Sequence, residues 1–268
     1  MNADAHLIET FLAPIRVCAS YRPAFGQSGS GGIDLPTFQE LYGGDPFYVW
    51  LGLDDPLVYA AHKAAGGLTS VYRQIGVGTE RLLREIIRDA LGLNETQTAW
   101  RYQYVKPDGK SGVHILDARI SLRDVDALRR QLLAGWVAST GPHIGLDAAK
   151  LRRVTGIVFE IRQGYKSADS KRQNADLRFG MSAYQEGLLP VFMILSRQVS
   201  ETVIKRYKAN NMAVMTGVLT NDPQSSTFAF FKQVVGYDLA AFFKRNTETL
   251  KSEILRNVHA LLSATESP

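Results

Sequence analysis

Two carboxylates interrupt otherwise apolar segments of the chain, where an unpaired charge is costly to bury. Asp117 lies in "HILDARI" and Glu160 lies in "IVFEIRQ". Each acid therefore needs a cation, which can be a basic side chain or a metal. On neighbouring strands, the two acids would form an oxygen-rich site of the kind that suits Mg²⁺. Such a site can hold a water molecule against a phosphodiester and stabilise charge on the leaving oxygen.

Two basic residues follow Glu160. Strand alternation places Val158, Glu160 and Arg162 on one face, so Arg162 can pair with Glu160 or with a phosphate. Its guanidinium stays protonated and cannot act as a general base. Lys166 follows Gly164, where we expect a bulge or bend in the strand. Strand alternation therefore does not give the direction of the Lys166 side chain, and a lysine there could orient the attacking water. The alternative is that Glu160 and Arg162 form a purely structural ion pair.

A third acid, Glu80, follows the sequence "GVGT". The periodicity of "TERLLREIIRDALGL" predicts a helix with Thr79 as N-cap and Gly92 as C-cap. Glu80 in the first turn of this helix suits the helix dipole, which is a sufficient structural reason for it. It could also reach a metal if the helix packs beside the two acid-bearing strands.

The segment "KSADSKRQNAD" opens a further helix and crowds polar groups near its start, namely Lys171, Arg172, Gln173 and Asn174. Helix N-termini bind phosphate, and amides can contact phosphates or base edges. A solvated polar helix start is the competing interpretation. The density of basic and amide groups close to the acids favours DNA contact.

The elements that must position these groups follow from hydrophobic periodicity. "WRYQYVKPDGKSGVHILDARI" predicts two strands joined by a turn at Pro107-Asp108-Gly109, with Asp117 on the second strand. Further strands are expected at 157–163, 190–196 and 212–218, with helices at 171–187, at 201–210 and towards the C-terminus. This order predicts an α/β fold with a mixed central sheet flanked by helices. Residues 1–67 are expected to form a loop-rich extension, and residues 68–268 the core with the C-terminal helices.

Composition limits the classes of function. The 268 residues are 45% hydrophobic and 21% charged, as in soluble globular proteins. Thirty-one Lys and Arg against 26 Asp and Glu give a charge of +5, which weakly favours a polyanionic partner. A single cysteine, Cys18, and the absence of a signal-peptide pattern predict a cytoplasmic protein. The longest apolar run, "LLPVFMIL", is too short to span a membrane.

Other chemistries lack their motifs. "GVGTE" has no lysine and Ser/Thr of a phosphate-binding loop, so no nucleotide cofactor is expected. The five histidines show no metal-ligand spacing, and no G-x-S-x-G nucleophile motif occurs.

Taken together, the helical glutamate after "GVGT", the hairpin with Asp117, the strand with Glu160 and the helix with Gln173 resemble the core of the PD-(D/E)xK nucleases. More narrowly, four segments resemble the ApaLI-like type II restriction endonucleases: "LTSVYRQIGVGTERLLREIIRDALGL", "FEIRQGYKSADSKRQNAD", "LPVFMILS" and "VVGYDLAAFFKRN". The resemblance covers roughly Leu68 to Leu262.

The resemblance implies a restriction-endonuclease-like core that cuts double-stranded DNA at a short, palindromic site with Mg²⁺, acting as a homodimer. By position, Asp117 and Glu160 would be the metal-binding acids, and Glu80 would match the helical glutamate of some members. The N-terminal region would supply DNA recognition or dimer contacts. A structure-selective repair or junction nuclease with the same core, or a non-catalytic DNA-binding protein, remains the alternative.

One position departs from the family motif, which places lysine two residues after the strand acid. Arg162 stands there in this chain. Either Arg162 takes a modified role, or Lys166 is the catalytic lysine, or Gln163 replaces it as an amide does in some related enzymes. We favour Lys166, because an amine can lose a proton or orient water.

Overall fold

The computed structural model describes residues 4–26, 31–105, 108–164 and 170–264, without the side chains of residues 170–172. The chain divides into two compact units. The helical unit comprises Met1–Gly78 and Lys244–Pro268, and the sheet unit comprises Thr79–Phe243. The sequence predicted a boundary at residue 67 and grouped the C-terminal helices with the core, whereas the last helix belongs with the N-terminal segment.

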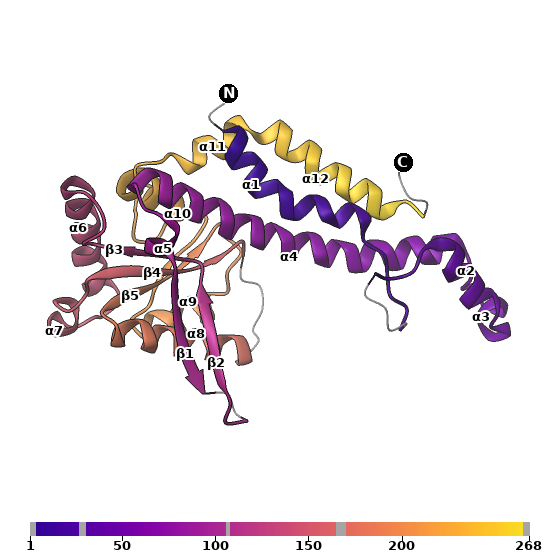
Figure 1. Cartoon of the computed structure of the whole chain (residues 1–268), viewed down its shortest axis with the longest axis horizontal. Helices are drawn as coiled ribbons and strands as arrows, with labels where there is room; N and C mark the ends of the chain where they lie inside the picture. Colours follow the sequence, from indigo (N-terminus) through magenta and orange to yellow (C-terminus); the bar gives the residue numbers. More distant parts are fainter. Residues whose placement is uncertain (1–3, 27–30, 106–107, 165–169, 265–268) are drawn as a thin grey trace. The chain divides into compact units, whose positions relative to one another are not determined.

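The helical unit is built from short helices around two longer ones (Figure 1). Its elements are α1 (Ala5–Arg16), the 3₁₀-helix η1 (Val17–Ser20), α2 (Leu35–Gly43), α3 (Pro46–Trp50), the first part of α4 (Pro56–Leu91), and α12 (Thr247–Leu262). Ion pairs tie the two ends of the chain together, which explains the grouping. Arg245 donates to Asp4 with an Nη2–Oδ1 distance of 2.7 Å, and Arg16 Nε lies 2.8 Å from Glu253 Oε2.

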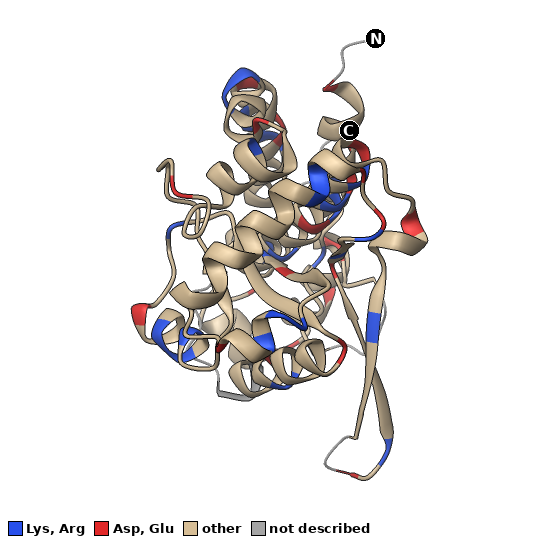
Figure 2. Cartoon of the chain, turned by 90° about the vertical axis from the view of Figure 1, so that its left-hand side faces the viewer, with Lys and Arg blue, Asp and Glu red and all other residues tan. Residues whose placement is uncertain are grey.

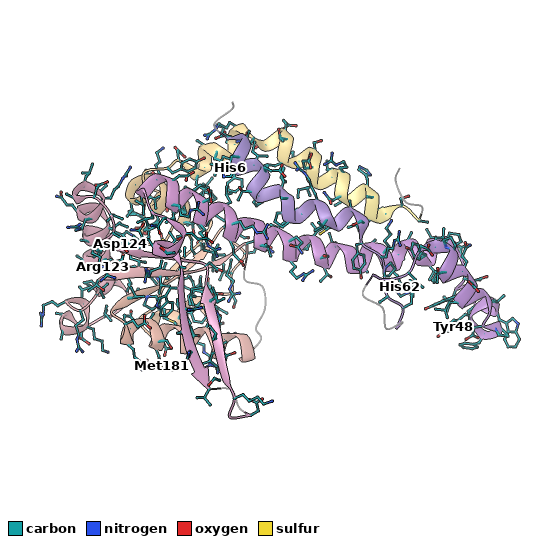
Figure 3. All side chains as sticks on the ribbon, in the orientation of Figure 1. His6, Tyr48, His62, Arg123, Asp124 and Met181 are labelled. Atoms are coloured by element: carbon teal, nitrogen blue, oxygen red, sulfur yellow. The ribbon has the colours of Figure 1, made fainter. Side chains whose placement is uncertain are left out.

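Aromatic side chains pack where the N-terminal loop meets α2 and α4. The Phe25 ring lies 4.8 Å from that of Phe38, which is fully buried, and 4.7 Å from that of His62. Tyr48 on α3 stacks on Tyr42 at 4.7 Å (Figure 3 labels Tyr48 and His62). The region that the sequence described as loop-rich therefore has an aromatic core of its own.

Helix α4 corrects the predicted helix start at Thr79. The helix begins at Pro56, so Thr79 lies in its interior and is not an N-cap. A Cβ on Gly78 would lie 2.3 Å from the backbone oxygen of Phe11, so this glycine permits the close approach of α1 and does not end a helix. The predicted end is confirmed, because the last helical residue is followed by Gly92 with φ +65°.

Two sheets form the centre of the sheet unit. Strands β1 (Trp100–Val105) and β2 (Ser111–Leu116) pair antiparallel, as predicted, although Pro107 of the expected turn lies outside the described residues. The second sheet has the order β3-β4-β5-β6. Its strands are β3 (Ala118–Ser121), β4 (Gly156–Arg162), β5 (Leu188–Ile194) and β6 (Ala213–Met215). β3 runs antiparallel to β4, whereas β4, β5 and β6 are parallel.

Helices cover both faces of this mixed sheet, which confirms the predicted α/β class. The described helices of the unit, besides the end of α4, are α5 (Glu95–Thr98), α6 (Ala127–His143), α7 (Ala148–Leu151), α8 (Ser170–Gln185), α9 (Glu201–Lys208), α10 (Thr227–Phe230), the π-helical turn η2 (Phe231–Val235) and α11 (Leu239–Arg245), which ends in the helical unit. No helix in the described parts of the chain is both long and apolar enough to cross a membrane.

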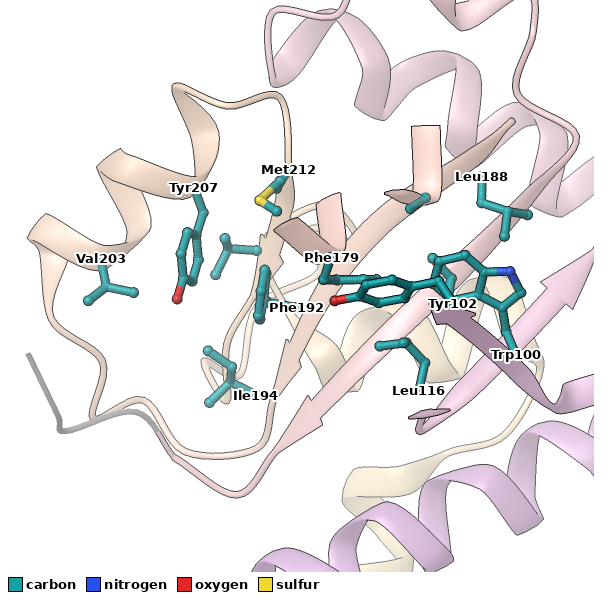
Figure 4. Packing of buried hydrophobic residues seen from close by; sticks show 13 residues of the cluster. Trp100, Tyr102, Leu116, Phe179, Leu188, Phe192, Ile194, Val203, Tyr207 and Met212 are labelled. Carbon is teal, nitrogen blue, oxygen red and sulfur yellow. The ribbon is translucent and has the colours of Figure 1, made fainter. Parts of the chain in front are cut away.

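The two faces of β4 match the predicted alternation. Val158 belongs to a core cluster with Phe179 of α8, Phe192 of β5 and Tyr207 of α9 (Figure 4). Phe159 points the other way, with its ring 5.8 Å from that of Phe230 on α10. Glu160 and Arg162 share the parity of Val158 and therefore rise on the α8–α9 side of the sheet.

Gly217 provides a test of the packing at the end of β6. A Cβ at this position would lie 1.8 Å from the backbone oxygen of Leu195. We expect Gly217→Ala to lower the free energy of unfolding by at least about 2 kcal/mol in urea denaturation, because backbone cannot yield as a side chain does.

Gly135→Ala is the matched control, since Gly135 is exposed on α6 and a Cβ there meets nothing within 4 Å. This change should stabilise the protein by about 0.5–1 kcal/mol through the helix propensity of alanine. Equal effects of the two substitutions would contradict the tight packing at Gly217.

Candidate acid site

Asp117 occupies the single position between β2 and β3. The sequence placed it on the second hairpin strand, but the chain bends here and passes from the two-stranded to the four-stranded sheet. The pairing of Ala118 with Phe159 brings Asp117 beside Glu160. The backbone N–H of Ile161 donates to Asp117 Oδ2 at 2.7 Å, and Arg84 of α4 donates to its backbone oxygen. The bend is therefore fixed from two sides.

Glu160 lies in the middle of β4 and is only 8% exposed. Its Oε1 is 2.8 Å from Arg162 Nη2, and its Oε2 is 3.6 Å from His114 Nε2 on β2. The expected ion pair between Glu160 and Arg162 is thus formed. A buried carboxylate requires such partners, because the cost of removing the charge from water is several kcal/mol.

Arg162 bridges two carboxylates. Its Nη2 also lies 3.0 Å from Asp176 Oδ1 on α8, and the Arg162 side chain is 14% exposed. Asp176 in turn accepts a hydrogen bond from the hydroxyl of Tyr207 on α9. Tyr207 is fully buried and stacks on Phe192 at 4.3 Å. A continuous polar row therefore runs from the sheet through Arg162 to two helices.

Negative charge accumulates at Asp117. Burial raises the pKa of the Asp117 carboxyl well above its ordinary value of 3.8, and the charges of Glu160 and Glu80 raise the pKa further. The hydrogen bond from Ile161 and the charge of Arg162 lower it, but they do not compensate.

The position of Glu80 also removes the explanation of this acid by the helix dipole. Helix α4 begins at Pro56, so Glu80 is far from the helix N-terminus. A helix dipole acts only over the first and last turns and cannot account for an acid here. The prediction of a first-turn glutamate was wrong because the packing of Gly78 sustains the helix through "GVGT".

The structure describes two of the three candidates for the position of the motif lysine, namely Arg162 and Gln163. Arg162 is committed to Glu160 and Asp176, and Gln163 follows β4 with its backbone oxygen accepting from Ser196 N at 2.9 Å. Lys166 lies outside the described residues. The choice among the three residues therefore remains a prediction.

The four residues predicted to bind DNA lie in the first turns of α8. The side chains of Lys171 and Arg172 are outside the described part of the structure. Gln173 Oε1 and Asn174 Oδ1 accept hydrogen bonds from Arg206 of α9 at 2.6 and 2.9 Å. Gln173 is buried and serves to join α8 to α9, whereas Asn174 is exposed.

Three members of the site were missed by sequence reasoning: His114, Asp176 and Tyr207. Strand alternation placed Arg162 on the same face as Glu160, and a guanidinium has more N–H donors than one carboxylate uses. These remaining donors could have indicated a second acceptor such as Asp176. No comparable signal pointed to Tyr207. His114 lies three residues before Asp117, and its role depends on strand pairing that the sequence does not state.

The donor set suits a hard divalent cation. Asp117 and Glu160 offer carboxylate oxygens, and the raised pKa of Asp117 reports negative charge that a cation would neutralise. Among the described residues, no group of three or more His, Cys, Asp or Glu side chains is arranged to hold a metal. Mg²⁺ does not require one, since it is commonly held by one or two carboxylates, water and substrate phosphates.

Comparisons of the chain with models of known protein families, with curated proteins and with solved structures found no match. The chemistry of the site is therefore argued from its geometry.

The charge at Asp117 predicts a pH-dependent stability in the absence of metal. An acid whose pKa is raised in the folded state favours folding below about pH 4 and loses that contribution as the pH rises. We expect Asp117→Asn to raise the free energy of unfolding by about 1–3 kcal/mol at about pH 7 in EDTA, with little difference at about pH 4. Urea denaturation across this range measures both values.

Asp117→Ala is the control, because asparagine keeps an acceptor for the Ile161 N–H and alanine does not. The alanine variant should therefore gain less stability at neutral pH. An asparagine variant that is less stable than the parent protein at about pH 7 would show that the negative charge is compensated.

The bridge through Asp176 predicts a large loss on truncation. Asp176→Ala should lower the free energy of unfolding by about 2–3 kcal/mol, because it removes the carboxylate that Arg162 and Tyr207 share. Asp176→Asn should cost less, since it keeps an acceptor for the Tyr207 hydroxyl. Glu201→Ala on α9, where the Glu201 side chain is 88% exposed, serves as the control and should change stability by less than about 0.5 kcal/mol. Similar losses for Asp176→Ala and Glu201→Ala would contradict the bridge.

Proposed function

We propose that the protein is a metal-dependent endonuclease that hydrolyses phosphodiester bonds in double-stranded DNA, of the type II restriction kind. The observation that carries this proposal is the pairing of Asp117 and Glu160, which the register of β3 with β4 sets beside each other at the bend between the two sheets. The order of these groups along the chain agrees with the resemblance to the PD-(D/E)xK nucleases. A homodimer in the cytoplasm is part of the same proposal.

Asp117 and Glu160 are the residues that would hold Mg²⁺, with Glu80 as a further acid nearby. The cation supplies charge neutralisation at the scissile phosphate and lowers the pKa of bound water. The Ile161 N–H fixes one oxygen of Asp117 and leaves Oδ1 for a ligand. His114 Nε2 and Arg162 Nη2 orient the Glu160 carboxylate, at distances of 3.6 and 2.8 Å from its two oxygens.

Arg162 acts as a positioning residue in this proposal. Its guanidinium is held between Glu160 and Asp176, so its effect on the substrate is exerted through Glu160. Lys166 is then the residue that we assign to the attacking water. Of the two alternatives, the non-catalytic DNA-binding protein is better supported by this geometry than the junction nuclease, because Arg162 already supplies Glu160 with a cation.

The β1–β2 ribbon offers a surface for duplex DNA. Figure 2 shows the two strands standing out from the rest of the sheet unit. Its inner face joins the core through Trp100, Tyr102 and Leu116. Its outer face is exposed and consists of Arg101, Gln103, Val105, Ser111, Val113 and Ile115. A two-stranded ribbon fits the major groove, where arginine reads guanine, glutamine reads adenine and aliphatic groups contact the thymine methyl.

The cleavage prediction tests the proposal directly. Incubation of the purified protein with plasmid DNA and Mg²⁺ should give discrete fragments, and EDTA should abolish them. Glu160→Gln should reduce the rate at least about a hundredfold, because it removes a metal-binding charge. Agarose electrophoresis over time measures both rates.

Matched variants separate the candidate roles. Lys166→Ala should abolish cleavage with DNA binding retained, whereas Lys150→Ala on the exposed α7 should leave the rate unchanged. Gln103→Ala should alter the set of sites that are cut. Intact DNA after incubation with a wide range of sequences, together with binding that survives EDTA, would overturn the enzyme and support the binding protein. Cleavage that follows branched structure and not sequence would support the junction nuclease.

A further inference from the structure

The helical unit exposes a group of large apolar side chains around α3. Phe47 is 60% exposed, Trp50 81%, Leu51 58% and Leu57 75%. Exposed apolar residues scattered singly are normal, but a cluster that includes a tryptophan marks an interaction surface. We call residues 40–57 the knob.

The charge around the knob restricts its partner. Residues 23–62 contain five acids and neither lysine nor arginine, in a chain whose formal charge is +5. The acids are Asp34, Glu40, Asp45, Asp54 and Asp55. Asp45 and Asp55 accept hydrogen bonds from the backbone N–H groups of Phe47 and Leu57, at 2.9 and 2.7 Å, so their charges are fixed beside the apolar group. Such a surface repels DNA and anionic membranes and requires a basic partner with apolar content.

A cleft in the same unit has the complementary character. It lies between the segment after η1, α4 and α12, with a volume of about 1130 Å³. Its lining is mainly basic and includes Arg22, Lys63, Lys251, Arg256 and His259, together with the apolar Leu255 and the acid Glu248, whose Oε1 lies 3.5 Å from Lys251 Nζ. Leu255 is 54% exposed, and Lys63 is buried, with its Nζ donating to the Ser263 carbonyl at 3.1 Å. Pockets for small molecules measure about 300–1,000 Å³, so this cleft suits an inserted segment of protein.

We propose that the knob of one copy of this chain inserts into the cleft of a second copy, and that the second knob occupies the first cleft. A two-fold axis makes this exchange self-complementary and closes it at two copies. Phe47 and Trp50 would enter the cleft beside Leu255, with Glu40 and Asp54 facing Lys251 and Arg256. The dimer does not depend on the acid site or on DNA.

Truncation of the aromatic anchors is the first arm of the test. Sedimentation velocity of the full chain, without DNA or metal, should show a dimer for the parent protein. The double variant Phe47→Ala and Trp50→Ala should raise the dimer Kd at least about thirtyfold. Leu219→Ala, which removes a 77% exposed leucine from the sheet unit, is the matched control and should leave the Kd unchanged.

Charge exchange is the second arm and identifies the cleft as the receptor. Glu40→Lys with Asp54→Lys reverses the charge at the two knob positions that face the cleft, and Lys251→Glu with Arg256→Glu reverses it at the two cleft positions that they meet. Each double variant alone should be monomeric, because like charges meet at both contacts. A mixture of the two should form a heterodimer, since both of its contacts again join opposite charges.

Three results would overturn the proposal: a monomeric parent protein at every concentration, a dimer unaffected by the aromatic truncation, or a mixture of charge-reversed variants that stays monomeric. Circular dichroism of each variant reports folding, and the exposed positions chosen leave the buried residues of the unit unchanged. A monomeric parent protein would remove the homodimer from the proposed function but not the cleavage chemistry of the acid site, and absence of cleavage leaves the dimer untouched.

Discussion

The carboxylate of Glu160 sits in a strand whose other residues up to Ile161 are also buried, and its charge must be matched inside the protein. Arg162 provides that match from the same face of the strand. Because the Arg162 side chain is only 14% exposed, its remaining donors need a second carboxylate, and Asp176 supplies one from α8. The Tyr207 hydroxyl then brings α9 into the same network. One buried charge thus determines how two helices dock on the sheet.

Strand alternation predicted much of this arrangement. The two faces of β4 and the mixed sheet follow from local patterns that burial enforces, and the pairing of Glu160 with Arg162 is one of the two that this alternation allowed. The start of α4 did not follow, because Gly78 looks like a helix breaker until the backbone of Phe11 is placed against it. Local propensity is overridden here by a contact between residues far apart in the sequence.

Long-range hydrogen bonds account for what the sequence could not give at the site. The sequence predicted that Gln173 and Asn174 bind DNA. Instead, both amides accept hydrogen bonds from Arg206, which is 33 and 32 residues away along the chain. Asp176 meets Tyr207 across 31 residues. Neither partner is marked by periodicity or by a motif, since a polar residue on a short helix is normally solvated. Which polar groups remain available to a ligand depends on packing that only the three-dimensional structure specifies.

The bend at Asp117 has a mechanical consequence. The same strand that ends in the exposed ribbon continues, one residue later, into the sheet that holds Glu160. A ligand that twists the ribbon would therefore turn the Asp117 carboxylate relative to its neighbour. If the protein acts on duplex DNA as we propose, a poorly matched duplex would bind with nearly full affinity and still leave the acids misaligned. Selectivity would then be expressed in the turnover rate more than in the dissociation constant, as expected when binding energy is used to assemble a reactive geometry.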